Sequence, residues 1–115
     1  MSTTGDVKLP PPKPEALSVL VAPMPQDRSA YAEGWLNVWR VLSGPQLPVE
    51  EAHAKKWAEL SHGQGINPDG FLRQMAAIIA SGSRKDALRA VTVPTLVVHG
   101  DADPLVPLEG GIDTA

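Results

Sequence analysis

The sequence predicts a mostly α-helical chain that carries one β-strand, at about residues 94–99. Between residues 14 and 91, apolar side chains recur at the three- and four-residue spacing of amphipathic helices. The stretch "VPTLVVHG" then forms a short, continuous apolar run, rich in β-branched residues and bounded by Pro94 and Gly100. Such a run is typical of a strand that is buried on both faces, as in a parallel sheet.

Residues 1–13 are expected to form a proline-rich connector. The stretch "KLPPPKPEA" holds too many prolines to be helical and is typical of an extended polyproline segment. Segments of this kind serve as plain linkers or, less often, as ligands for aromatic-lined grooves. Pro14 suits the first position of a short helix that continues to Leu20.

The next predicted helix starts after Asp27, a good N-cap, and ends at Gly44. Tyr31, Trp35 and Trp39 repeat along it at helical spacing. Two tryptophans four residues apart could line a substrate pocket, although an aromatic stripe of this kind more commonly belongs to a hydrophobic core.

A third helix is predicted from Pro48 to about His62, with Trp57 among its apolar positions. His53 and His62 are far apart in the sequence and have few acidic companions, so we interpret both as surface residues. No metal site is expected.

The fourth predicted helix has Asn67 as its N-cap and ends at Gly82. Ser83 is a plausible cap for a short helical turn that follows. The apolar face of the fourth helix, which we expect to be core, consists of Phe71, Met75, Ile78 and Ile79.

Composition narrows the class of protein. The formal net charge is -3, so nucleic acid and anionic membrane surfaces are not expected partners. The chain has no cysteine, which excludes disulfides and thiolate chemistry. No apolar run approaches the ~20 residues of a membrane span, and no signal peptide is recognisable. We therefore expect a soluble, cytoplasmic chain without a cofactor.

Two aspartates, Asp101 and Asp103, directly follow the predicted strand. In open α/β sheets, catalytic groups gather beyond the carboxyl ends of the strands. The alternative is a turn stabilised by local hydrogen bonds of the aspartates. A calcium-binding EF-hand loop is excluded, because Leu105 stands where a ligand is required and Val106 where a glycine is required. The match to phosphotransferases of the haloacid-dehalogenase type is poor, because a glycine separates strand and acid.

The stretch "VPTLVVHGDADPLVPLEGG" resembles the segment of the α/β-hydrolase superfamily that carries the acid of the Ser-Asp-His triad. The resemblance implies that Asp103 is the triad acid and that a helix begins at Leu108. It also implies that residues 14–91 form the family's helical cap and residues 92–115 a partial core. The opening "MSTTGD" is similar to a motif of esterase-like members.

The resemblance thus implies a fragment of an α/β-hydrolase fold, from an enzyme that is expected to hydrolyse a carboxylic ester, such as a small lactone or a methyl ester. The same scaffold also serves dehalogenases, epoxide hydrolases and peroxidases, so the reaction stays open. The family's G-x-S-x-G nucleophile motif is absent, and His99 precedes the acid, so the serine and the histidine are expected outside the chain. The chain alone is expected to be inactive. The residues expected to face an apolar substrate are Trp35, Trp39, Trp57, Phe71 and Met75.

An alternative from a different class stays open. The chain could be a small, non-catalytic helical protein from a truncated gene, acting through binding. In either case the predicted strand lacks sheet neighbours within the chain. We therefore expect self-association, because an unpaired apolar strand favours pairing with another chain.

Overall fold

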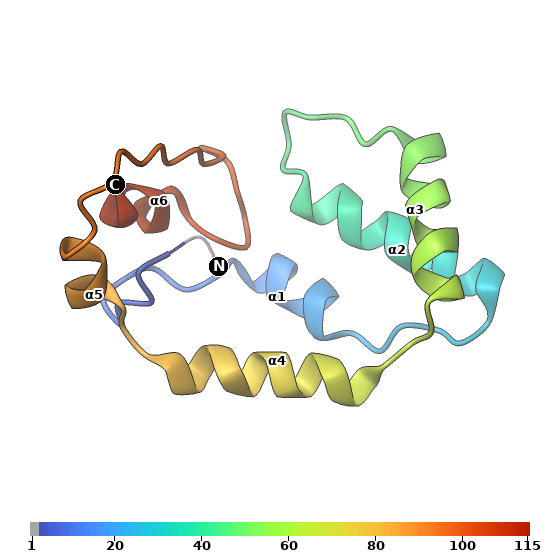
Figure 1. Ribbon diagram of the computed structural model, residues 1–115. Coiled ribbons are helices and arrows are strands. Elements are labelled where there is room, and N and C mark those ends of the chain that lie inside the picture. Colours follow the sequence, from blue (N-terminus) through green and yellow to red (C-terminus); the bar gives the residue numbers. More distant parts are fainter. Residues whose placement is uncertain (1–2) are drawn as a thin grey trace.

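A computed structural model of the chain describes residues 3–115, which form helices joined by turns and irregular segments (Figure 1). The described residues contain no β-strand. The helices in this range are α1 (Pro14–Val21), α2 (Arg28–Leu42), α3 (Glu51–Gly63), α4 (Pro68–Ser81), α5 (Lys85–Arg89) and α6 (Leu108–Thr114).

The helix ends follow local capping chemistry. The side chain of Asp27 accepts a hydrogen bond from the backbone N–H of Ala30 at 3.0 Å, and α2 starts there. The side chain of Asn67 does the same for the N–H of Gly70 at 2.8 Å, at the start of α4. Gly82 ends α4 with a φ of 57°, a conformation that glycine adopts at little cost. These three predicted caps are confirmed.

The small core lies where α2 packs against α3 and α1. Helix α3 begins at Glu51, three residues after the predicted start at Pro48, because the backbone of Glu50 is still extended. Among residues 3–115, three of the five buried hydrophobic residues are alanines, so the core contains few large side chains. The buried hydrophobic residues of the described chain are Ala16, Tyr31, Leu36, Ala54 and Ala58.

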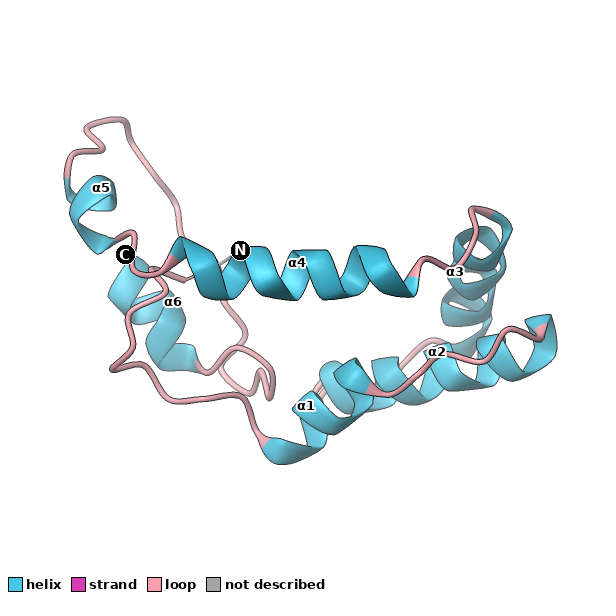
Figure 2. Ribbon diagram, turned by 90° about the horizontal axis from the view of Figure 1, so that it is seen from below, coloured by secondary structure: helices cyan, strands magenta, loops and turns pink. Residues whose placement is uncertain are grey.

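Helix α4 contributes nothing to this core. Figure 2 shows it as a separate rod, and none of its residues is buried. Ile79 is 77% exposed, and Phe71 and Met75 are only partly covered. The expectation that its apolar face is core was therefore wrong. Amphipathic spacing shows which face could be buried, but no element of residues 3–115 packs closely along that face.

The predicted β-strand at residues 94–99 is not formed, so the predicted fold class, an α/β-hydrolase fragment with one core strand, is wrong for this chain. The segment is irregular and lies on the surface, with Leu96 85% and Val98 82% exposed. A strand is stable only when its backbone N–H and C=O groups pair with neighbouring strands. The rest of the described chain is helical or irregular and offers no such neighbour.

A polar junction joins the N-terminal segment to α5 and α6. Thr4 is fully buried, and its hydroxyl donates to Asp113 Oδ2 at 2.6 Å. Lys85 Nζ donates to the other carboxylate oxygen of Asp113, while the N–H of Arg84 donates to the Thr4 carbonyl at 2.7 Å. Of the "MSTTGD" motif, Met1 and Ser2 lie outside the described residues, and the rest belongs to this junction.

The described chain is open in shape. Its radius of gyration is 16.0 Å, whereas a compact domain of 100 residues has about 13 Å. In both ribbon views α4 lies between the α2–α3 pair and the α5–α6 end (Figures 1 and 2). None of the described helices has the length and apolar character needed to cross a membrane.

Candidate functional site

The loop from Gly100 to Pro107, here called the acid loop, is held by the carboxylate of Asp103. Its Oδ1 accepts hydrogen bonds from the backbone N–H groups of Leu105 at 2.8 Å and Val106 at 2.9 Å. An aspartate that binds the amides two and three residues ahead forms a rigid local turn. Within residues 3–115, no group donates a hydrogen bond to Oδ2, so that oxygen is left for another partner.

Three contacts anchor the acid loop to the rest of the chain. The N–H of Lys13 donates to the Pro104 carbonyl at 2.8 Å, which ties the proline-rich connector to the loop. His99 Nε2 lies 2.7 Å from the carbonyl oxygen of Val106, which closes the base of the loop. Gly44, just after α2, approaches so closely that a Cβ there would lie 3.1 Å from the Ala102 carbonyl oxygen.

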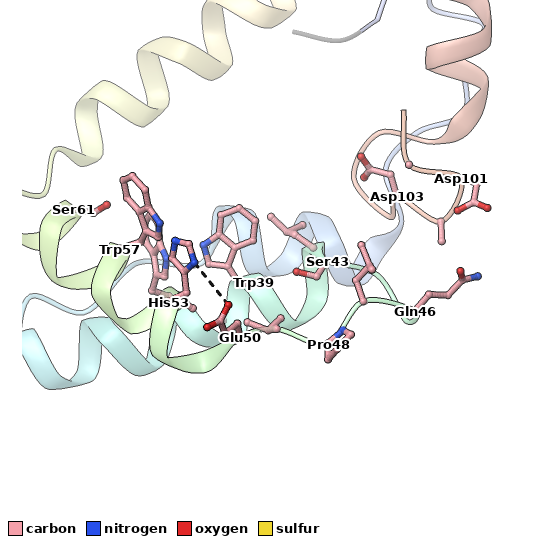
Figure 3. A pocket seen from close by; sticks show the side chains of 17 residues that line it. Trp39, Ser43, Gln46, Pro48, Glu50, His53, Trp57, Ser61, Asp101 and Asp103 are labelled. Atoms are coloured by element: carbon pink, nitrogen blue, oxygen red, sulfur yellow. Dashed lines mark ion pairs between the residues drawn. The ribbon is translucent and has the colours of Figure 1, made fainter. Parts of the chain in front are cut away.

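The third contact brings the acid loop alongside α2 and α3, and a cavity of about 1060 Å³ lies between them. Ligand-binding pockets of proteins commonly enclose about 300–1,000 Å³, so this cavity has room for a small organic molecule. Figure 3 shows Trp39, His53 and Trp57 side by side on the helical wall, with the acid loop opposite. All three tryptophans of the chain line this cavity.

The residues proposed from sequence divide into two groups. Trp35, Trp39 and Trp57 line the cavity together with Asp103. Phe71 and Met75 belong to α4 and are not part of its lining. The structure thus brings the tryptophans and the acid together, and it leaves the α4 residues elsewhere.

Other lining residues were missed by sequence reasoning. His53 stacks on Trp57 with ring centroids 6.1 Å apart, and its position one helical turn earlier was a signal available in the sequence. Asp101, which the sequence had singled out together with Asp103, shares the cavity with it. The connection between α2 and α3 contributes Gln46, Leu47, Pro48 and Val49, for which the sequence carried no signal.

The helical wall is aromatic and partly open to solvent. Trp39 is 44% and Trp57 54% exposed, and both belong to the cavity lining. Trp35 is more covered and stacks with Tyr31 at a centroid distance of 5.9 Å. The indole N–H of Trp35 is buried and has no acceptor in the described chain. An unsatisfied buried donor is unfavourable.

The charged groups of the lining are all acidic. Glu50, Asp101 and Asp103 line the cavity, and no lysine or arginine does. Glu50 lies 4.0 Å from His53 Nδ1, and both side chains are largely exposed at the rim. Among residues 3–115, no group of three or more His, Asp or Glu side chains is close enough to hold a metal ion.

Serine, histidine and aspartate all occur in the lining, but they do not form a catalytic triad. Neither Ser43 nor Ser61 is hydrogen-bonded to His53, and the only polar contact of His53 within the described chain is with Glu50. Asp103 uses its Oδ1 for backbone amides. A search against models of protein families found no match to the chain.

Proposed function

We propose that this chain is the acid-bearing, substrate-binding part of a serine-type carboxylic-ester hydrolase. The observation that carries the proposal is the cavity itself, because it places Asp103 opposite Trp35, Trp39 and Trp57. The proposal concerns the chemistry of the acid loop and of this cavity. It does not include the predicted strand, and it relies on the resemblance of the acid loop to the triad-acid segment of α/β-hydrolases.

In the proposed reaction, a serine hydroxyl attacks the ester carbonyl carbon while a histidine takes its proton. The alcohol then leaves with a proton from the same histidine, and water releases the acid product. Asp103 accepts the Nδ1–H of the histidine through Oδ2, the oxygen that the loop amides leave unoccupied. It thereby fixes the tautomer and stabilises the imidazolium. The serine and the histidine are supplied from outside this chain.

The test is to express the chain together with its flanking coding sequence and to compare two substitutions. Asp103→Asn should lower the turnover of a p-nitrophenyl ester by about 10⁴-fold, because the amide favours the wrong histidine tautomer. Asp101→Asn is the matched control, since it removes a neighbouring carboxylate of the same cavity. It should change turnover by less than about ten-fold. A crippling Asp101→Asn with a mild Asp103→Asn would refute the assignment of the acid, and two mild variants would refute the hydrolase proposal.

The 115-residue chain by itself should show no esterase activity. It should also resist labelling by a fluorophosphonate, because neither Ser43 nor Ser61 has a histidine partner. Labelling of either serine, detected by mass spectrometry, would show that the nucleophile lies within the chain and would contradict the division of the triad.

A second candidate is a non-catalytic binding protein. The observation that favours it is that the described residues form a cavity but no catalytic triad. This candidate predicts ligand binding by the chain without turnover in any longer product of the same gene. The hydrolase proposal predicts turnover that depends on Asp103.

A further inference from the structure

The cavity between the acid loop and helices α2 and α3 has walls of complementary chemistry. Trp39 supplies an electron-rich aromatic face on one side, beside the stacked pair of His53 and Trp57, and Asp101 and Asp103 supply carboxylates on the other (Figure 3). In that view the carboxylate of Asp103 is directed toward the space beside Trp39, and that of Asp101 is directed away. The acid loop therefore brings one carboxylate to face the aromatic wall.

This combination suits a positively charged ligand. The face of an indole ring attracts cations, and tryptophan is the strongest of the aromatic side chains in this respect. A carboxylate across the same space adds a direct charge attraction, which grows as water is excluded. No lysine or arginine in the lining opposes it.

The cation must be organic rather than a metal ion. The acidic groups of the lining are too dispersed to coordinate a metal, whereas an apolar body fits a surface made largely of indole rings and aliphatic side chains. The volume of about 1060 Å³ accommodates a substituted ammonium together with an aromatic or aliphatic group of similar size.

We propose that this cavity binds a small organic ammonium ion with an apolar body. The inference rests on the proposed function, which makes this cavity the substrate-binding site. It adds that the ligand is positively charged. In the hydrolase, the histidine pairs with Oδ2 of Asp103, so the indole face of Trp39 holds the cation, and the preferred ester is one whose acyl or alcohol part carries a substituted ammonium group. In the binding protein, the same cation is the ligand itself.

The experiment uses the 115-residue chain and its own fluorescence, because all three tryptophans line the cavity. The chain is titrated with benzyltrimethylammonium, with benzyl alcohol as the neutral counterpart and phenylacetate as the anionic one. Benzyltrimethylammonium should bind about ten-fold more tightly than benzyl alcohol, and phenylacetate should bind most weakly. Raising the salt concentration should weaken only the binding of the cation appreciably.

Substitutions locate the binding. Trp39→Leu and Asp103→Asn should each weaken benzyltrimethylammonium about five-fold, because one removes an aromatic face and the other a facing charge. Asp103→Asn keeps an oxygen that can accept the two loop amides, so the loop is retained. Glu109→Gln is the matched control, since it removes an exposed charge outside the lining and should leave the affinity unchanged.

Equal affinity for the three probes, or preference for phenylacetate, overturns the inference whatever the variants do. The inference is also overturned if Glu109→Gln weakens the preference for the cation as much as Asp103→Asn does. The attraction would then come from the net charge of the chain and not from the cavity. The result is separable from the proposed function. If the longer protein hydrolyses neutral esters but the cavity binds no cation, only this inference is refuted. If the cavity binds the cation but hydrolysis does not depend on Asp103, only the hydrolase proposal is refuted.

Discussion

Gly44 controls how closely the acid loop approaches α2. Its φ of +74° lies in the left-handed region, where a side chain is strained, and a Cβ would lie 3.1 Å from the carbonyl oxygen of Ala102. The glycine is therefore required both for the turn after α2 and for the contact that forms one edge of the cavity. A single residue thus links the chain's backbone geometry to its candidate site.

Gly44→Ala should lower the free energy of unfolding by about 1–2 kcal/mol, from backbone strain, and should also displace the acid loop. We expect binding of benzyltrimethylammonium to weaken in parallel. Urea unfolding followed by circular dichroism measures the first effect, and tryptophan fluorescence the second. Gly63→Ala is the matched control, because a Cβ there meets nothing within 4 Å. If both alanines behave alike, Gly44 has no special role.

At the scale of single elements, α2 depends on its N-cap. The Asp27 side chain satisfies the N–H of Ala30, one of the donors that a helix start leaves without a partner. Helix α2 also carries Trp35 and Trp39, so its stability bears on the cavity.

Asp27→Ala should destabilise the chain by about 1 kcal/mol, and Asp27→Asn by much less, because asparagine is also a good N-cap. The measurement is the urea midpoint of the helical signal. Equal losses for the two substitutions would show that the charge of Asp27, rather than its hydrogen bond, stabilises α2.

The junction of the N-terminal segment with α5 and α6 depends on the ionised form of Asp113. The hydrogen bond from Lys85, followed by that from Thr4, holds the pKa of the Asp113 carboxyl below its ordinary value. A carboxyl whose pKa is lowered by folding stabilises the folded state at neutral pH. That contribution declines as the pH falls from about 3.9, the unfolded value, through the lower folded pKa.

Asp113→Asn should therefore reduce stability at pH 7 and remove part of the loss of stability below about pH 4. Unfolding free energies measured from pH 7 to pH 3 test this. Arg40 lowers the pKa of the Glu51 carboxyl by a hydrogen bond and by its charge. The variant therefore keeps the part of the stability loss at low pH that comes from Glu51. An unchanged pH profile in Asp113→Asn would mean that the Asp113–Lys85 contact contributes nothing to stability.

For the whole molecule, the dominant feature is apolar surface that the chain does not cover. Val93, Leu96 and Val98 are all exposed in one irregular segment, and α4 adds Leu72 and Ile79. Exposed apolar patches of this kind commonly mark association surfaces. Residues 93–98 carry no charge and are rich in β-branched side chains, a composition typical of strands. The segment therefore favours backbone pairing with a strand of another chain.

We predict that the chain self-associates as its concentration rises. Sedimentation velocity should show species larger than the monomer, and the double substitution Leu96→Lys with Val98→Lys should reduce them strongly. Ile79→Lys, an equally exposed position on α4, is the control and should have the smaller effect. A monomer at all concentrations, with cooperative thermal unfolding, would contradict the prediction.

Local chemistry made much of the helical structure predictable. Asp27, Asn67 and Gly82 act as caps because their own backbone and side-chain geometry requires only neighbours in the chain. The helix that the resemblance implied from Leu108 is confirmed as α6. The tryptophans were candidates for a pocket from their spacing, but the spacing equally fitted a core, and only the structure puts all three in one lining.

The amino-acid sequence alone thus determined the caps at Asp27, Asn67 and Gly82 and the absence of thiol chemistry, and it left the turn at Asp103 as one of two interpretations. These properties depend on groups that lie within a few residues of one another. Tertiary structure decided the rest. It left the apolar run at 94–99 without a strand, because a strand needs hydrogen-bonding partners that the described chain does not provide. It left the apolar face of α4 uncovered, and it brought the acid loop against α2 through Gly44. Which surfaces meet is a property of the whole chain, since burial needs a second surface that no local pattern supplies.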